Sequence, residues 1–152
     1  MKTIAKVSLI AAALAFLLPM AAQQLLAQGK HPRYLHALSD LRFARALLQR
    51  PNGGQLGAQE RDAIHDIDEA IGEIKRASID DGKNIDDHDP VDPHMPWQGR
   101  LHKSRDLLDK AIRDCSKEED DPHTQGLQAR ILDHLHRAHN HVDEAIAIVE
   151  HH

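Results

Sequence analysis

The segment Ile131–His152, "ILDHLHRAHNHVDEAIAIVEHH", decides the fold because its apolar residues recur every three or four positions. At about 100° per residue, this spacing gathers them on one face of an amphipathic helix. The same spacing begins further upstream, so we expect one helix from about Pro122 to Glu150. The residues predicted to face inward are Leu127, Ile131, Leu135, Ala138, Val142, Ala145, Ile146 and Val149.

Three other segments share this period, and strand-like alternation is absent from the sequence. The predicted helices are Pro32–Arg50, Ala58–Ile79 and Trp97–Lys117. Short links join the first helix to the second and the third to the fourth, whereas a longer acidic link, Asp80–Pro96, joins the two halves. Because each apolar stripe has to be buried against other helices, the sequence predicts an all-α four-helix bundle.

The two halves of the chain also resemble each other. The pattern Leu-His-x-x-x-Asp-Leu occurs at residues 35–41 and again at 101–107. The patterns "IDEAI" and "VDEAI" occur at residues 67–71 and 142–146, in the same order relative to the first pattern. We therefore predict two duplicated helical hairpins joined by the longer acidic link.

The N-terminus has the composition of a signal peptide. Lys2 and Lys6 precede the apolar run Val7–Leu18, which is too short to span a bilayer, and small residues follow where a peptidase would cut, after Ala22 or Ala27. We expect residues 1–27 to be a cleaved signal peptide and residues 28–152 to form the bundle domain, periplasmic or secreted and free of the membrane. An uncleaved anchor is the alternative.

The charge and cysteine content exclude several classes of protein. The formal charge is −5, and it falls to −7 on loss of residues 1–27, which hold two lysines and no acids. An acidic chain argues against nucleic acid or an anionic membrane as the partner. Cys115 is the sole cysteine, so no internal disulfide forms, and its place on an apolar face predicts a buried, inert thiol.

Four of the thirteen histidines lie inside the last predicted helix, within the eight-residue span 134–141. His136, His139 and Asp143 are spaced to give two nitrogens and a carboxylate on one surface patch, which suits zinc, copper or nickel. His134 and His141 flank the apolar stripe on its other side, so we expect them to meet a neighbouring helix, as boundary histidines or as half of an interhelical site. The alternative for all four is a solvated polar face.

The repeated pattern supplies a second set of candidate metal ligands. His36 with Asp40, and His102 with Asp106, are each spaced at i and i+4, which places both side chains on one helix face. Two such pairs from two helices can surround one ion in a bundle. The alternative for each pair is a local hydrogen bond or ion pair between histidine and carboxylate.

The first helix carries a further stripe that continues from its histidine–aspartate pair. Phe43 and Leu47 extend the His36 and Asp40 positions and indicate a second buried face. This stripe is the candidate surface for a protein partner or for self-association. It supports the alternative function, a structural or protein-interaction bundle with solvated histidines and no metal.

Catalytic chemistry has no support in the sequence. A carboxylate-bridged di-iron bundle needs inward Glu-x-x-His motifs, but Asp62-x-x-His65 and Asp133-x-x-His136 both face away from the apolar stripes. No nucleophile elbow or phosphate loop is present, so we expect no enzyme activity. The acidic link is interpreted as a solvated loop or, alternatively, as a hard-cation or mixed histidine–aspartate site.

Several blocks of the chain resemble known proteins. "HPRYLHALSDLRFAR" (31–45), "DDGKN" (80–84), "GRLHKSRDLLDKA" (99–111), "EED" (118–120) and "HVDEA" (141–145) are similar to the recurring blocks of an uncharacterised family of small exported bacterial helical-bundle proteins. That resemblance covers most of the mature chain and implies no activity. In its histidine-rich, acidic and exported style the chain is also similar to periplasmic small metal-binding proteins, which carry denser and more regular histidine repeats.

Overall fold

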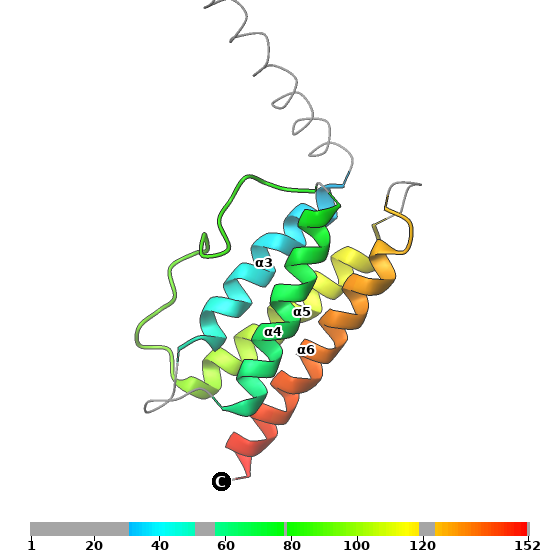
Figure 1. Cartoon of the computed structure of the whole chain (residues 1–152). Coiled ribbons are helices and arrows are strands. Elements are labelled where there is room, and N and C mark those ends of the chain that lie inside the picture. Colours follow the sequence, from blue (N-terminus) through cyan, green and yellow to red (C-terminus); the bar gives the residue numbers. More distant parts are fainter. Residues whose placement is uncertain (1–30, 51–56, 78, 119–123, 152) are drawn as a thin grey trace, which may run out of the picture.

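The computed structural model describes residues 31–50, 57–77, 79–118 and 124–151, so the expected signal peptide lies outside the described residues. The described part contains four helices and no strand: α3 (Pro32–Leu48), α4 (Ala58–Arg76), α5 (Trp97–Ser116) and α6 (Leu127–Glu150) (Figure 1). The helices pack side by side along their lengths. The predicted all-α four-helix bundle is confirmed.

The helices form a ring in which α3 and α6 each contact α4 and α5 (Figure 1). Neighbouring helices are antiparallel: Arg33 at the start of α3 contacts Lys117 after α5, while Arg50 after α3 contacts Arg100 near the start of α5. The starts of α4 and α5 lie at the same end of the bundle, where the Trp97 indole donates to a Glu60 carboxylate oxygen at 2.9 Å. One long crossover, residues 77–96, makes this arrangement possible.

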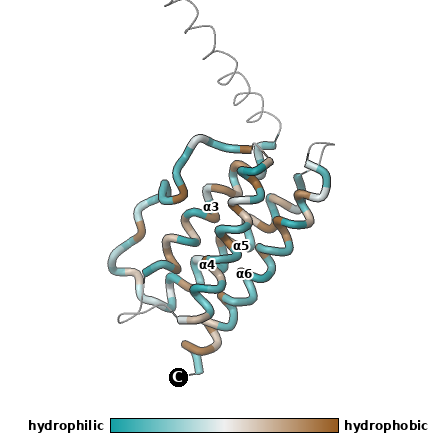
Figure 2. The backbone as a smooth tube through the Cα atoms, in the orientation of Figure 1, coloured by the Kyte–Doolittle hydropathy of each residue, from teal (hydrophilic) through white to brown (hydrophobic). Residues whose placement is uncertain are grey.

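Leucine, isoleucine and alanine fill the core between the helices, and polar residues alternate with them along each helix (Figure 2). The predicted inward residues of α6 are buried except Val149, which is only partly buried. In α5, the Ser104 hydroxyl donates to the Ala44 carbonyl oxygen at 3.3 Å, which satisfies a polar group inside the core. The sequence did not indicate that Glu60 and Asp66 of α4 are also buried.

Helix α3 ends at Leu48 rather than Arg50 and α5 at Ser116 rather than Lys117, and two further boundaries differ from the sequence prediction for a local reason. Helix α4 ends at Arg76 rather than Ile79, because the Ile79 amide donates back to the Ile74 carbonyl and the Ile79 side chain is buried. Helix α6 begins at Leu127, directly after Gly126, whose φ of +74° is left-handed and favours glycine. The predicted start at Pro122 lies outside the described residues.

The two hairpins correspond in packing, but only one of the matched sequence patterns is equivalent in structure. The buried positions of "IDEAI" in α4 are also buried in "VDEAI" of α6. In the other pattern Asp40 is buried whereas Asp106 is exposed. Burial in α3 and α5 corresponds when the alignment shifts by one residue, so that Tyr34, Leu41 and Ala44 match Leu101, Leu108 and Ala111.

The crossover is held against α3 by a fully buried arginine. The Arg42 guanidinium pairs with both carboxylate oxygens of Asp81, and its Nε donates to the Asp87 carbonyl oxygen at 3.0 Å. Ile79 and Val91 of the crossover are buried as well. A buried guanidinium without partners is strongly unfavourable, so the crossover is an integral part of the fold.

The stripe predicted to form a second buried face on α3 is covered within the chain at three of its four positions, one of which is the buried Asp40. Leu47 is buried, and Phe43 is half-buried with its ring stacked against His88 of the crossover, at 6.4 Å between ring centroids. His36, by contrast, is exposed. The crossover therefore contacts the part of α3 that the sequence marks as a candidate docking surface.

Replacing Arg42→Ala should lower the free energy of unfolding by about 3 kcal/mol, because it leaves a largely buried carboxylate unpaired. Urea denaturation followed by circular dichroism measures this loss. Arg45→Ala is the matched control: Arg45 is three residues away and pairs with the more exposed Asp68 and Asp86, so about 1 kcal/mol or less is expected. Equal losses in the two variants would contradict the anchoring role of Arg42.

The Asp81 carboxyl should make part of the stability depend on pH. Burial favours its neutral form, but hydrogen bonds from Arg42 and the Lys83 amide outweigh this and lower the pKa below 3.8. Asp81 therefore contributes stability that is full above about pH 5 and is lost as the pH falls through 3.8 and then through the folded-state pKa.

Comparing wild type with Asp81→Asn tests this dependence. The difference in unfolding free energy should be largest between about pH 5 and 7 and shrink below about pH 4, as the wild-type carboxylate becomes protonated. Urea denaturation at several pH values measures it. A difference that stays constant down to about pH 3 would show that the charge of Asp81 does not matter.

Candidate functional site

The histidines of α6 separate onto its two interfaces. The apolar stripe of α6 points into the core, so residues on either side of it lie at the lines of contact with α4 and α5. His134 and His141 lie at the α4–α6 interface, whereas His139 lies at the α5–α6 interface. His136 is exposed. The expectation that His134 and His141 meet a neighbouring helix is confirmed.

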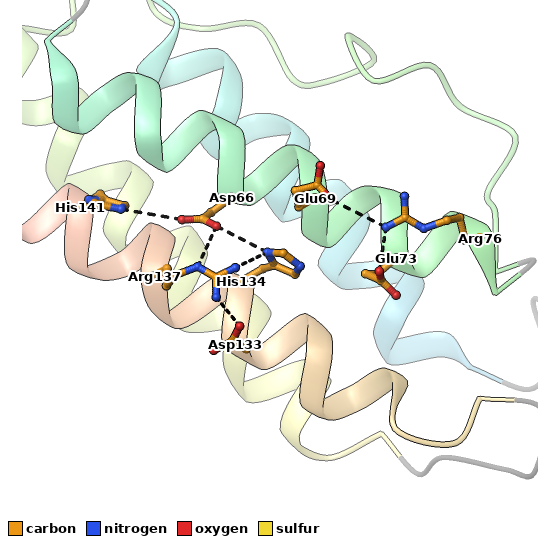
Figure 3. Close-up of polar contacts among 8 residues, drawn as sticks. All are labelled: Asp66, Glu69, Glu73, Arg76, Asp133, His134, Arg137 and His141. Carbon is orange, nitrogen blue, oxygen red and sulfur yellow. Dashed lines mark hydrogen bonds and ion pairs between the residues drawn. The ribbon is translucent and has the colours of Figure 1, made fainter.

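At the α4–α6 interface, the buried Asp66 carboxylate is the centre of a polar cluster (Figure 3). One of its oxygens accepts a hydrogen bond from Arg137 Nε at 3.0 Å and lies 3.4 Å from His134 Nδ1. The other oxygen lies 3.8 Å from His141 Nε2. A carboxylate that is only 6% exposed thus faces two imidazoles and one guanidinium.

The Arg137 guanidinium already supplies the cation that this cluster needs. It pairs with Asp66 and Asp133, whose hydrogen bonds raise the pKa of Arg137. One of its terminal nitrogens lies 2.6 Å from His134 Nδ1. Because a guanidinium only donates, His134 Nδ1 accepts there and its lone pair is engaged. A metal ion at Asp66 would have to displace the Arg137 guanidinium.

At the α5–α6 interface, both ring nitrogens of His139 face carboxylates. Nε2 lies 3.2 Å from Asp109 Oδ1 of α5, and Nδ1 lies 3.2 Å from Asp143 Oδ2 of α6. The other Asp143 oxygen is 3.9 Å from Arg105. A nitrogen and an oxygen at this separation can both lie about 2.0–2.2 Å from one zinc ion, so each distance is compatible with a shared metal.

The predicted patch of His136, His139 and Asp143 is present only in part. His139 and Asp143 are brought together, while His136 remains exposed on the outer side of α6. Across the described ranges, no three histidine, cysteine, aspartate or glutamate side chains are grouped closely enough to hold one ion. His139 is therefore the one member of the predicted patch that faces carboxylates from two helices, Asp109 of α5 and Asp143 of α6.

The predicted pair on α3 does not form. Asp40 is buried against α5, where it accepts a hydrogen bond from Lys110 Nζ at 2.9 Å, whereas His36 is exposed. The spacing of i and i+4 permits contact along one helix. Here the approach of α5 gives Asp40 a cation from another helix.

The predicted pair on α5 does not form either. His102 Nε2 lies 3.3 Å from Glu150 Oε1 at the end of α6, and Asp106 is exposed. The repeated histidine–aspartate pairs therefore do not come together around one ion. Their histidines and carboxylates instead have partners on neighbouring helices or face solvent.

The acidic link and α3 line an open polar hollow of about 290 Å³, whose lining residues are Ser39, Lys83, Asp86, Asp87, His88 and Asp89. Several of its carboxylates are occupied locally. Asp86 pairs with Arg45 at 3.1 Å, Asp87 accepts from the Asn84 amide, and Asp92 accepts from the His94 amide. The contacts of Asp87 and Asp92 are local to turns of the link, which fits the interpretation as a solvated loop, whereas the Asp86 contact joins the link to α3.

Cys115 is fully buried, and burial raises its pKa to about 12. The predicted burial of this thiol is confirmed, and its predicted inertness stays a prediction. No helix in the described ranges is long and apolar enough to cross a membrane. No protein-family model, curated protein or solved structure matches this chain.

The Cys115 thiol should resist alkylation in the folded protein. At pH 8, a pKa near 12 instead of about 8.5 reduces the thiolate fraction by roughly three orders of magnitude. Labelling with iodoacetamide, in buffer and in denaturing urea, measures the effect by mass spectrometry. Equally fast labelling in both conditions would contradict the burial of this thiol.

Proposed function

We propose that this chain is an exported, non-catalytic four-helix bundle that binds a divalent transition metal ion, zinc, copper or nickel, at His139. The observation that supports this most is the pair of carboxylates facing the two ring nitrogens of His139, each at 3.2 Å. Imidazole nitrogen and carboxylate oxygen are ligands that these metals accept in proteins.

The exposure of the groups around His139 favours this place over the Asp66 cluster. The His139 side chain is 22% exposed and both carboxylates are about half exposed, so a hydrated ion reaches them without opening the core. At Asp66 the Arg137 guanidinium already compensates the buried charge. With two protein ligands and water, the site is suited to buffering an ion at modest affinity.

The remaining parts of the proposal rest on the sequence and on where the titratable groups lie. Export is supported by the signal-peptide composition of residues 1–27. The absence of catalysis is supported by the position of His134, His139 and His141 at the outer edges of helix interfaces, where each faces a carboxylate and not an enclosed cleft.

A structural or protein-interaction bundle without metal is the second candidate. The same contacts favour it, because His139, His141 and His102 already have carboxylate partners inside the chain. In the described part Ile148 is the only exposed large hydrophobic side chain. A partner of this bundle would therefore bind a mainly polar surface.

Calorimetric titration of the untagged protein with zinc and copper tests the metal proposal. Wild type should show saturable binding that His139→Ala abolishes and His136→Ala retains, since His136 is an exposed histidine on the same helix. Binding should also raise the melting temperature, because the ion stabilises the folded state.

The variants separate the remaining possibilities. Loss of binding in both would indicate that His136 joins His139 and Asp143 as the sequence predicts. Binding that is absent in wild type, or unchanged in His139→Ala, would contradict the proposal and favour the interaction bundle.

A further inference from the structure

The two carboxylates around His139 differ in their electrostatic surroundings. Asp143 lies four residues along the same helix and has Arg105 3.9 Å from its second oxygen. Asp109 comes from α5, and within the described ranges it pairs with no lysine or arginine. An added cation therefore gains most next to Asp109, the one of the two carboxylates with which no lysine or arginine of the described residues pairs.

A neutral His139 ring can offer a lone pair at only one of its two nitrogens. A neutral imidazole carries one N–H, so it donates to only one of its two carboxylate neighbours. If the single proton is on Nδ1, the side of Asp143, the unprotonated Nε2 lies 3.2 Å from the Asp109 oxygen. Two electron-rich atoms at that distance need a cation between them, either a proton or a metal ion.

We propose that the metal ion binds between His139 Nε2 and Asp109, so that it bridges α5 and α6, and that Asp143 orients the ring without binding the metal. This inference rests on the metal-binding function proposed above and assigns its ligands. A histidine bound to a metal commonly donates its other N–H to a carboxylate, which fixes the tautomer and the ring orientation. Asp143, held near Arg105, is placed to do this.

This assignment differs from the sequence interpretation in which Asp143 is a ligand on the surface of one helix. In the bridging site the ligands come from two helices, Asp109 of α5 and His139 of α6. The ion then links two neighbouring elements of the folded state. Both ligands are separated in the unfolded chain, so binding is coupled to the α5–α6 packing.

Nitrogen NMR of the zinc-loaded, untagged protein identifies the bound ring nitrogen. Long-range proton–nitrogen spectra should show the zinc-dependent shift at Nε2 of His139, with Nδ1 still protonated. A zinc-bound Nδ1 would overturn the inference while leaving metal binding at His139 intact. A His139 ring unaffected by saturating zinc would overturn both the inference and the proposed function.

Matched amide variants provide the second measurement. Asp109→Asn should abolish zinc binding, whereas Asp143→Asn should weaken it by about 10–100-fold and keep the Nε2 signature, as expected for an orienting group. The folding of each variant is checked by circular dichroism. Abolished binding in Asp143→Asn with retained binding in Asp109→Asn would reverse the assignment.

Discussion

The buried Arg42 guanidinium is the constraint on which the arrangement of the bundle depends. The chain leaves α4 at one end and has to return to the other end before α5 begins, so the crossover runs along α3. Arg42 holds that path through Asp81 and the Asp87 carbonyl. Because the crossover returns the chain, every pair of neighbouring helices is antiparallel, and α6 lies between α4 and α5.

That position gives one helix two chemically different interfaces. Toward α4, the buried Asp66 is compensated by Arg137, which also occupies a nitrogen of His134. Toward α5, no lysine or arginine of the described part pairs with Asp109, and only an imidazole faces it. The two interfaces therefore differ in how their carboxylates are compensated, because Arg137 lies 3.0 Å from Asp66 whereas Arg105 lies 3.9 Å from Asp143 and not within ion-pair distance of Asp109.

The sequence was sufficient to predict the helices and most of the core residues, because a helical period assigns each residue to one face of its helix. It was insufficient to predict which polar side chains pair with each other, since the register between helices is set by how apolar side chains interlock. Asp40 thus pairs with Lys110 on α5 and not with His36, and His102 lies beside Glu150. The buried Arg42 was missed, although the extra apolar stripe beside it was a signal that the outer side of α3 is covered.

The identity of the side chain at position 139 bears on what the α5–α6 interface is for. If charge pairing alone were required, a lysine or arginine would pair with both carboxylates and would stay charged at neutral pH. These contacts are partly exposed, so each adds little to a fold whose stability comes from the apolar core. A neutral imidazole instead has one N–H nitrogen and one nitrogen with a lone pair, and at position 139 each ring nitrogen lies 3.2 Å from a carboxylate oxygen. That combination is what coordination of a metal ion between His139 and Asp109 requires.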